Sequence, residues 1–115
     1  MNPRADELIR RLELKPHPEG GYYREVWRST ARVSESRHAS RSAVTTIYFL
    51  LAAGSFSAWH RVRSDEIWHW HEGEPLELLL ASPDLNIAQR RRLGPVGPDI
   101  EPVISVPADW WQAAR

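Results

Sequence analysis

The residues best suited to chemistry are His60 and Glu66, within the segment GSFSAWHRVRSDEIWHWHEG at residues 54–73. Side chains of a strand alternate between its two faces, and the polar corner at residues 63–65 predicts a tight hairpin between two strands. This hairpin would place an imidazole and a carboxylate on facing strands, both pointing inward. Such a pair can transfer protons or supply two metal ligands. The alternative is a buried, hydrogen-bonded pair that only holds two strands together.

The same alternation sorts the neighbouring aromatic and histidine residues. Trp68 and Trp70 share the face of Glu66, where they either pack in a core or wall a pocket suited to sugar rings or nucleotide bases. His69 and His71 fall on the opposite face, outside the sheet or in an interface. The alternative is that the two histidines form a second metal clip with an acidic neighbour. A bulge in the hairpin would invalidate the argument from facing.

A second polar segment, HPEGGYY at residues 17–23, holds further candidates. Its two glycines permit a tight turn, and a purely conformational role is one interpretation. In the functional interpretation, Glu19, Tyr22 or Tyr23 lies at the mouth of a barrel as a proton donor. A histidine base paired with a tyrosine acid suits proton removal next to a carbonyl group. Asp65, at the corner of the predicted hairpin, is interpreted as a turn residue.

One short helix and a series of short strands must position these residues. Asn2 and Pro3 form a helix start, and Pro16 ends the helix, which is expected within residues 1–15. The polar stretch 29–42 is predicted to be a loop. Strands are predicted at 22–27, 45–51, 56–62, 66–71, 76–80, 86–93, 103–106 and from Trp110 onward. Turn signals every eight to twelve residues or so are typical of a sandwich or barrel of the jelly-roll kind.

Length and composition set further bounds. The 115 residues fit one domain with one core, residues 1–115, of which the barrel is expected to occupy 20–115. The net charge of zero disfavours non-specific binding to nucleic acids or anionic membranes. The absence of cysteine excludes disulfides, thiolate metal sites and cysteine nucleophiles. The charged N-terminal segment lacks a signal core, and no apolar run approaches about 18 residues, so a cytoplasmic protein is expected.

Residues 54–73 resemble the first motif of the cupin superfamily, G-x5-H-x-H-x3,4-E-x6-G. Four residues occupy its positions: Gly54, His60, Glu66 and Gly73. Val62 stands in the slot of the second histidine, and Gln112 replaces the histidine of the second motif within PADWWQ. Only His60 and Glu66 remain of the superfamily's four metal-ligand positions. The resemblance therefore implies no cofactor, or at most a weakly held divalent metal at these two residues.

Longer segments resemble an uncharacterised bacterial and fungal cupin family that is related in fold to dTDP-4-dehydrorhamnose 3,5-epimerase. They are HPEGGYYREVWRS, TTIYFLL, SAWHRVRSDEIWHWHEG and VPADWWQAAR. The resemblance runs from about Leu8 to Arg115 and implies an all-β, cupin-type jelly-roll β-barrel with a short N-terminal helix, a pocket and a homodimer. Family members usually continue past the last segment. The chain is therefore either naturally short or lacks the final strands, and an open sheet edge would then need a partner.

These observations favour a cupin-like protein that binds a small polar metabolite in its barrel. One alternative is a metal-independent sugar isomerase or epimerase, with His60 as base, Glu66 assisting it and Tyr23 as acid. Another is a metal-dependent dioxygenase-type cupin, against which Val62 and Gln112 count. The remaining candidates are ligand-binding residues: Glu19, Tyr22, Trp68, Trp70 and Gln112. No spacing in the chain selects a substrate, and whether the protein is an enzyme stays open.

Overall fold

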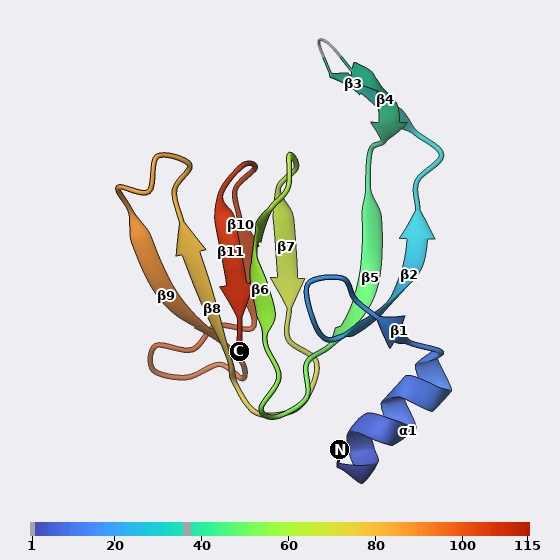
Figure 1. Cartoon of the computed structure of the whole chain (residues 1–115), viewed down its shortest axis with the longest axis vertical. Helices are drawn as coiled ribbons and strands as arrows, with labels where there is room; N and C mark the ends of the chain where they lie inside the picture. The colour runs from blue at the N-terminus through green and yellow to red at the C-terminus, as the bar shows by residue number, and fades with distance from the viewer. Residues whose placement is uncertain (1, 36–37) are drawn as a thin grey trace. The chain divides into compact units, whose positions relative to one another are not determined.

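The computed structural model describes residues 2–35 and 38–115. It is mostly β, with one short helix near the N-terminus (Figure 1), as the sequence predicts. The chain divides into two compact units, Met1–Ala52 and Ala53–Arg115, and each is described by itself. No helix within the described ranges is long and apolar enough to cross a membrane.

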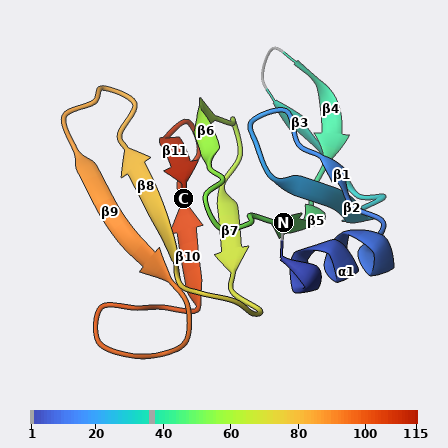
Figure 2. The same cartoon turned by 60° about the horizontal axis from the view of Figure 1, so that its bottom comes forward.

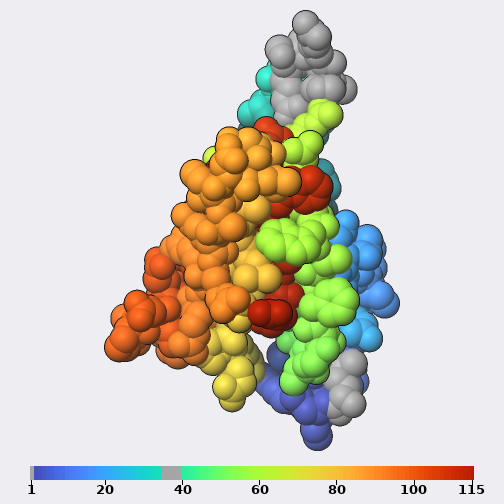
Figure 3. Space-filling model, turned by 60° about the vertical axis from the view of Figure 1, so that its left-hand side comes forward, coloured from blue at the N-terminus to red at the C-terminus, as the bar shows by residue number. Residues whose placement is uncertain are grey.

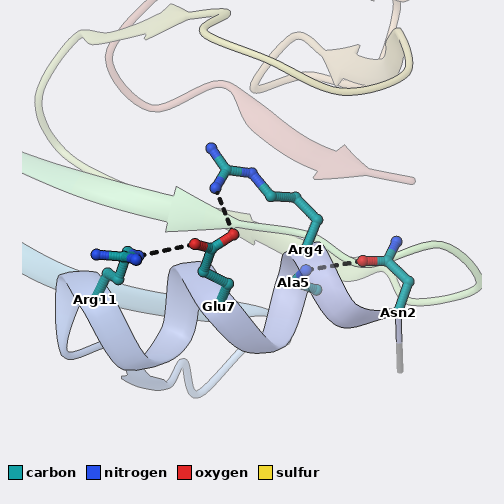
Figure 4. Close-up of polar contacts among 5 residues, drawn as sticks. All are labelled: Asn2, Arg4, Ala5, Glu7 and Arg11. Carbon is teal, nitrogen blue, oxygen red and sulfur yellow. Dashed lines mark hydrogen bonds and ion pairs between the residues drawn. The ribbon is translucent and has the colours of Figure 1, made fainter.

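Helix α1 (Pro3–Leu12) begins and ends with local signals that the sequence contains. The Asn2 side chain accepts a hydrogen bond from the Ala5 N–H at 2.8 Å, and Pro3 occupies the first turn, where no backbone donor is required (Figure 4). The helix ends at Glu13, whose N–H donates to the Ile9 carbonyl and whose left-handed backbone lets the Leu14 N–H reach the same carbonyl at 3.0 Å. The helix therefore stops before the proline that follows it, as expected.

One carboxylate organises the exposed face of α1. Glu7 accepts hydrogen bonds from Arg4 at 2.9 Å and Arg11 at 2.8 Å, one helical turn away on either side (Figure 4). The Arg11 guanidinium, followed by that of Arg4, lowers the pKa of the Glu7 carboxyl. Exposed pairs of this kind add only a few tenths of a kcal/mol each.

The first unit contains an antiparallel sheet in the order β1-β2-β5. Its strands are β1 (Lys15–Pro16), β2 (Tyr22–Arg28) and β5 (Thr45–Leu50). The prediction of a loop at 29–42 is wrong, because β3 (Arg32–Glu35) pairs with β4 (His38–Ser42). Arg32 adds to this pairing by donating to the Ser40 carbonyl and to Ser42 Oγ. Backbone pairing forms these strands without an apolar side-chain alternation, which is why the sequence pattern missed them.

The second unit contains two antiparallel sheets (Figure 2). The larger has the order β6-β11-β8-β9, and the smaller pairs β10 with β7. The strands are β6 (Ser57–Arg61), β7 (Glu66–His69), β8 (Leu76–Ala81), β9 (Ala88–Leu93), β10 (Val103–Val106) and β11 (Trp111–Ala114). Each of these matches a predicted strand to within two residues at either end.

The predicted hairpin of β6 with β7 is wrong, since the two strands belong to different sheets. At the corner between them, Asp65 Oδ1 accepts the Ala108 N–H at 2.8 Å, and the Val62 carbonyl accepts the Asp109 N–H at 2.8 Å. These bonds tie the corner to the turn before β11, so β6 pairs with β11 instead. The interpretation of Asp65 as a turn residue is confirmed, although the turn that its carboxylate supports is a distant one.

The core of the second unit lies on the inner faces of its strands. Its most deeply buried side chains are Leu78, Leu80, Ile104, Val106 and Gln112. Burying an aliphatic side chain of this size contributes about 1.5–3 kcal/mol. Gln112 is the polar member of this set and is only 1% exposed, so its hydrogen bonds decide what the interior can bind.

Candidate ligand-binding site

Gln112 is placed in the interior by the central strand of the larger sheet. On β11 it lies opposite His60 of β6 on one side and Leu80 of β8 on the other. Its Oε1 accepts a hydrogen bond from Trp68 Nε1 of β7 at 3.0 Å, which links the two sheets. An indole N–H can only donate, so the atom that faces it must be the amide oxygen. The Gln112 Nε2 group is therefore left with its two donors, and no residue in the described part of the chain accepts from them.

Trp70 contributes a second unpaired donor. Its backbone N–H donates to the Pro102 carbonyl at 2.8 Å, which extends the β7–β10 pairing and keeps Trp70 on the same face as Trp68. The Trp70 Nε1 atom is buried and has no acceptor among residues 2–35 and 38–115. Leaving a buried donor unsatisfied costs about 1–3 kcal/mol. A bound molecule with oxygen acceptors would remove this cost at both groups.

His60 presents an acceptor to the same face of the larger sheet as Gln112. Its Nδ1 lies 2.7 Å from the Ala58 carbonyl oxygen, which can only accept a hydrogen bond. Nδ1 therefore carries the hydrogen, and in the neutral imidazole Nε2 holds the lone pair. The ring is half-buried, so Nε2 can act as a hydrogen-bond acceptor or as a base toward a bound molecule.

Glu66 is half-buried on the same face of β7 as Trp68, opposite Val106 of β10. Within the described residues, neither an ion pair nor a hydrogen bond joins Glu66 to His60. The interpretation of these two residues as a hydrogen-bonded structural pair thus has no contact to support it. The half-buried Glu66 carboxylate forms no ion pair within residues 2–35 and 38–115, and its oxygens can accept hydrogen bonds from a polar ligand.

A register shift changes which residues accompany His60. Ser57 pairs with Ala114 although Gln112 pairs with His60, so β6 has one residue more than β11 over this stretch. Ser57 is consequently buried, whereas Phe56, which alternation would place on the face of His60, is 64% exposed. His69 is exposed on the opposite face of β7 from Glu66, as predicted, and His71 is exposed as well.

The donor set of this site does not fit a tightly held metal ion. His60 Nε2 and Glu66 are ligands of the right kind, but Val62 offers none. The Gln112 oxygen accepts from Trp68, and the remaining amide group is a donor. The described residues contain no cluster of three or more histidine and carboxylate side chains that could hold a metal ion.

The other predicted site residues belong to the first unit. His17 Nδ1 lies 3.1 Å from both the backbone nitrogen and the carboxylate of Glu19, so Glu19 is engaged by its neighbour. The Tyr23 ring packs edge-on against His17, with ring centroids 5.0 Å apart. Tyr22 and Tyr23 are adjacent in β2 and point to opposite faces, so only one of them can serve a given site. Their membership of the His60 site stays a prediction.

Trp111 and Arg61 are prominent residues that were not predicted to belong to a site. The Arg61 guanidinium lies 5.1 Å from the centroid of the Trp111 ring, on the face of the larger sheet opposite Gln112. Strand alternation could have predicted that Trp111 lies on the face opposite Gln112, because the two residues are adjacent in one strand. The cross-strand partnership with Arg61 depends on pairing between β6 and β11, which are far apart in the sequence.

Comparison with known proteins identifies relatives over nearly the whole chain. Residues 6–115 match the family model described as Cupin superfamily (DUF985). A solved structure of a hypothetical protein from Leishmania major is 38% identical with a TM-score of 0.89, and covers 96% of this chain and 68% of its own. A protein from Shewanella oneidensis is 34% identical with a TM-score of 0.84 and the same coverage. No curated protein matches the sequence.

Proposed function

The chain belongs to the family described as Cupin superfamily (DUF985), and from this premise we propose that its second unit binds a small polar molecule between its two sheets. The predicted cupin-type fold class, all-β with a short N-terminal helix, is confirmed by the family match and the element order. The specific ligand is a separate question, because the similar structures carry no functional description in their names.

The observation that supports binding is the pair of buried, unpaired donors, Gln112 Nε2 and Trp70 Nε1. Both groups require an oxygen acceptor such as a carbonyl, carboxylate or sugar hydroxyl. His60 Nε2 and the Glu66 carboxylate add acceptors for a hydroxyl or amine of the same molecule. The rings of Trp68 and Trp70 provide flat apolar surface, which suits the ring of a sugar or a similar metabolite.

The test is a thermal-shift screen of the whole chain against sugars, nucleotide sugars and carboxylic acids. A ligand at 100 times its dissociation constant stabilises the folded protein by about 2.7 kcal/mol. Gln112→Met and Trp70→Phe each remove the unpaired donor and leave an apolar side chain in its place. We expect each variant to weaken the binding of a ligand found in the screen by about tenfold or more. Gln89→Met makes the same substitution at an exposed position of β9 and serves as the control. Hits that all persist unchanged in both donor variants would refute the proposal.

A second candidate function is proton transfer by a metal-independent isomerase or epimerase. The favouring observation is the hydrogen bond from His60 Nδ1 to the Ala58 carbonyl, which leaves Nε2 as the basic atom of the neutral ring. Gln112 Nε2 would donate a hydrogen bond to a carbonyl oxygen of the ligand and so make the C–H next to that carbonyl more acidic. His60 Nε2 would then take the proton from this C–H. Glu66 would assist.

Hydrogen–deuterium exchange tests this candidate. In deuterated water, the C–H next to the carbonyl of a bound ligand should exchange, as followed by proton NMR, and His60→Gln should abolish the exchange while leaving binding largely intact. Exchange that continues at the same rate in His60→Gln would contradict the assignment of the base.

A further inference from the structure

The outer face of the larger sheet carries a hollow that is separate from the interior site. Its volume is about 300 Å³, and it is lined by Trp59, Ala81, Leu85 and Trp111. Figure 3 shows this side of the second unit, where side chains of β6, β11 and the β8–β9 turn gather. Trp111 and Gln112 are successive residues of β11 and therefore point to opposite faces. We call this hollow the outer groove.

The outer groove is built by strand register and by one small residue. Ala81, Trp111 and Arg61 lie side by side across β8, β11 and β6. Because Ala81 has only a methyl group, the space beside the Trp111 ring is left open. Trp59 and Leu85 border that space and are 52% and 67% exposed, which is high for large apolar side chains.

The turn that carries Leu85 is held in place by its own hydrogen bonds. The Asp84 carboxylate accepts from Ser82 Oγ at 2.7 Å and from the Asn86 N–H at 3.0 Å. Leu85 itself has a left-handed backbone, with φ of 64°, which a leucine adopts at a cost. Leu85 is therefore presented to the outer groove by a fixed turn. The oxygens of Asp84 are engaged within that turn, where the carboxylate keeps its negative charge.

Arg61 brings a positive charge next to the outer groove through its contact with Trp111, although it is not one of the residues that line the hollow. Its guanidinium stacks on Trp111, and no carboxylate in the described residues pairs with it. On the neighbouring part of the sheet, by contrast, Arg90 pairs with Glu77 and Arg91 pairs with Glu101. A stacked guanidinium keeps the N–H groups in its plane free, and their spacing matches the two oxygens of a carboxylate.

We propose that the outer groove binds a small aromatic carboxylate, with its ring against Trp59 and Leu85 and its carboxylate on Arg61. A volume of about 300 Å³ is at the lower end for small-molecule pockets and suits a one- or two-ring compound. One unpaired guanidinium balances one negative charge. An apolar wall next to a cation favours a ligand that combines an apolar ring with a negative charge over a neutral sugar, which offers no charge to Arg61.

The experiment is isothermal titration calorimetry of the whole chain with indole-3-carboxylate, with its uncharged carboxamide and with adenosine monophosphate. We expect binding of the carboxylate, and binding of the carboxamide weaker by about tenfold or more. Arg61→Gln should weaken binding of the carboxylate by a similar factor. Arg61→Lys should restore only part of the lost affinity, because an ammonium group lacks the paired donors of a guanidinium. Arg92→Gln removes an exposed arginine from the same sheet and should change nothing.

A second variant tests the groove independently of the charge. Ala81→Leu fills the hollow without altering Arg61, and it should abolish binding while the variant stays folded by circular dichroism. Gln112→Met should leave the titration unchanged, which separates this site from the interior one. Equal affinity for carboxylate and carboxamide, no heat of binding up to millimolar ligand, or tighter binding of adenosine monophosphate would each overturn the proposal.

Discussion

Gln112 is a buried residue of the second unit whose amide oxygen has a hydrogen-bond partner and whose amide nitrogen has none among the described residues. The Trp68 indole holds the oxygen, and the nitrogen projects two donors into the interior. The neighbouring Trp70 adds a third donor. At the scale of single residues, the interior therefore presents donors that have no acceptor among the described residues, one of them at the position of a metal-binding histidine in the superfamily motif.

Two tryptophan substitutions should separate a satisfied donor from an unsatisfied one. Trp68→Phe and Trp70→Phe remove similar volumes, but only the former breaks a hydrogen bond and leaves the Gln112 oxygen without its donor. We expect Trp68→Phe to lower the free energy of unfolding by about 1–2 kcal/mol more than Trp70→Phe. Urea denaturation of both variants measures the difference. Equal losses would mean that Trp70 Nε1 is satisfied in solution.

At the scale of elements, short turns determine where the strands run. The turn at residues 17–21 depends on Gly21, whose φ is +81° and where a Cβ atom would lie 2.7 Å from the Leu50 carbonyl oxygen. Gly54 has nearly the same backbone conformation, with φ of +82°, but no atom of the described residues lies within 4 Å of the place of its Cβ. Comparing substitutions at the two glycines therefore distinguishes the cost of the left-handed backbone from the cost of a steric clash.

Gly54→Ala should cost only the left-handed conformation, which is about 1 kcal/mol for a residue with a Cβ. Gly21→Ala should cost more, by about 1–3 kcal/mol, because the strand pairing of β2 with β5 must also shift. Thermal or urea unfolding of the two variants provides the comparison. A Gly21→Ala variant as stable as Gly54→Ala would show that the first turn relaxes freely.

The β8–β9 turn and helix α1 should both contribute to acid sensitivity. A hydrogen bond from Ser82, followed by one from the Asn86 backbone, lowers the pKa of the exposed Asp84 carboxyl from 3.8, and Arg11 with Arg4 lowers that of Glu7 from 4.5. A lowered folded-state pKa adds stability that is complete above the unfolded value and is lost as the pH falls through the folded one. Stability should thus decline below about pH 4.5, and Asp84→Asn with Glu7→Gln should flatten the decline. An unchanged slope in the double variant would contradict this assignment.

At the scale of the whole molecule, the homodimer expected from the family resemblance remains a prediction. Several large apolar side chains of both units are exposed: Val26, Trp27, Ile47, Phe56, Ile67 and Val103. Exposed apolar surface on this scale is a common property of association interfaces. Light scattering at micromolar concentration should give twice the chain mass of 13.3 kDa, and a mass of one chain would contradict the expectation.

Local pattern was sufficient for most of the elements. The helix start at Asn2 and Pro3, the apolar alternation at residues 45–51 and the turn residues between strands predicted α1 and eight of the eleven described strands. The two-residue strand β1 was not predicted. The hairpin of β3 with β4 was missed because its strands carry no apolar alternation. The choice of His60, Glu66 and Gln112 as candidates came from a motif resemblance, and their function stays to be tested.

Tertiary structure decided what these residues can do. Strand alternation placed Glu66 and Trp68 on one face, but it could not show that β6 pairs with β11 or that Trp68 reaches Gln112 from another sheet. The Trp68–Gln112 contact spans 44 residues, and the sequence holds no local signal for it or for the pairing of β6 with β11. Sequence alone therefore determined the elements and the candidate residues, whereas long-range pairing decided which donors are satisfied, which remain free and where the outer groove lies.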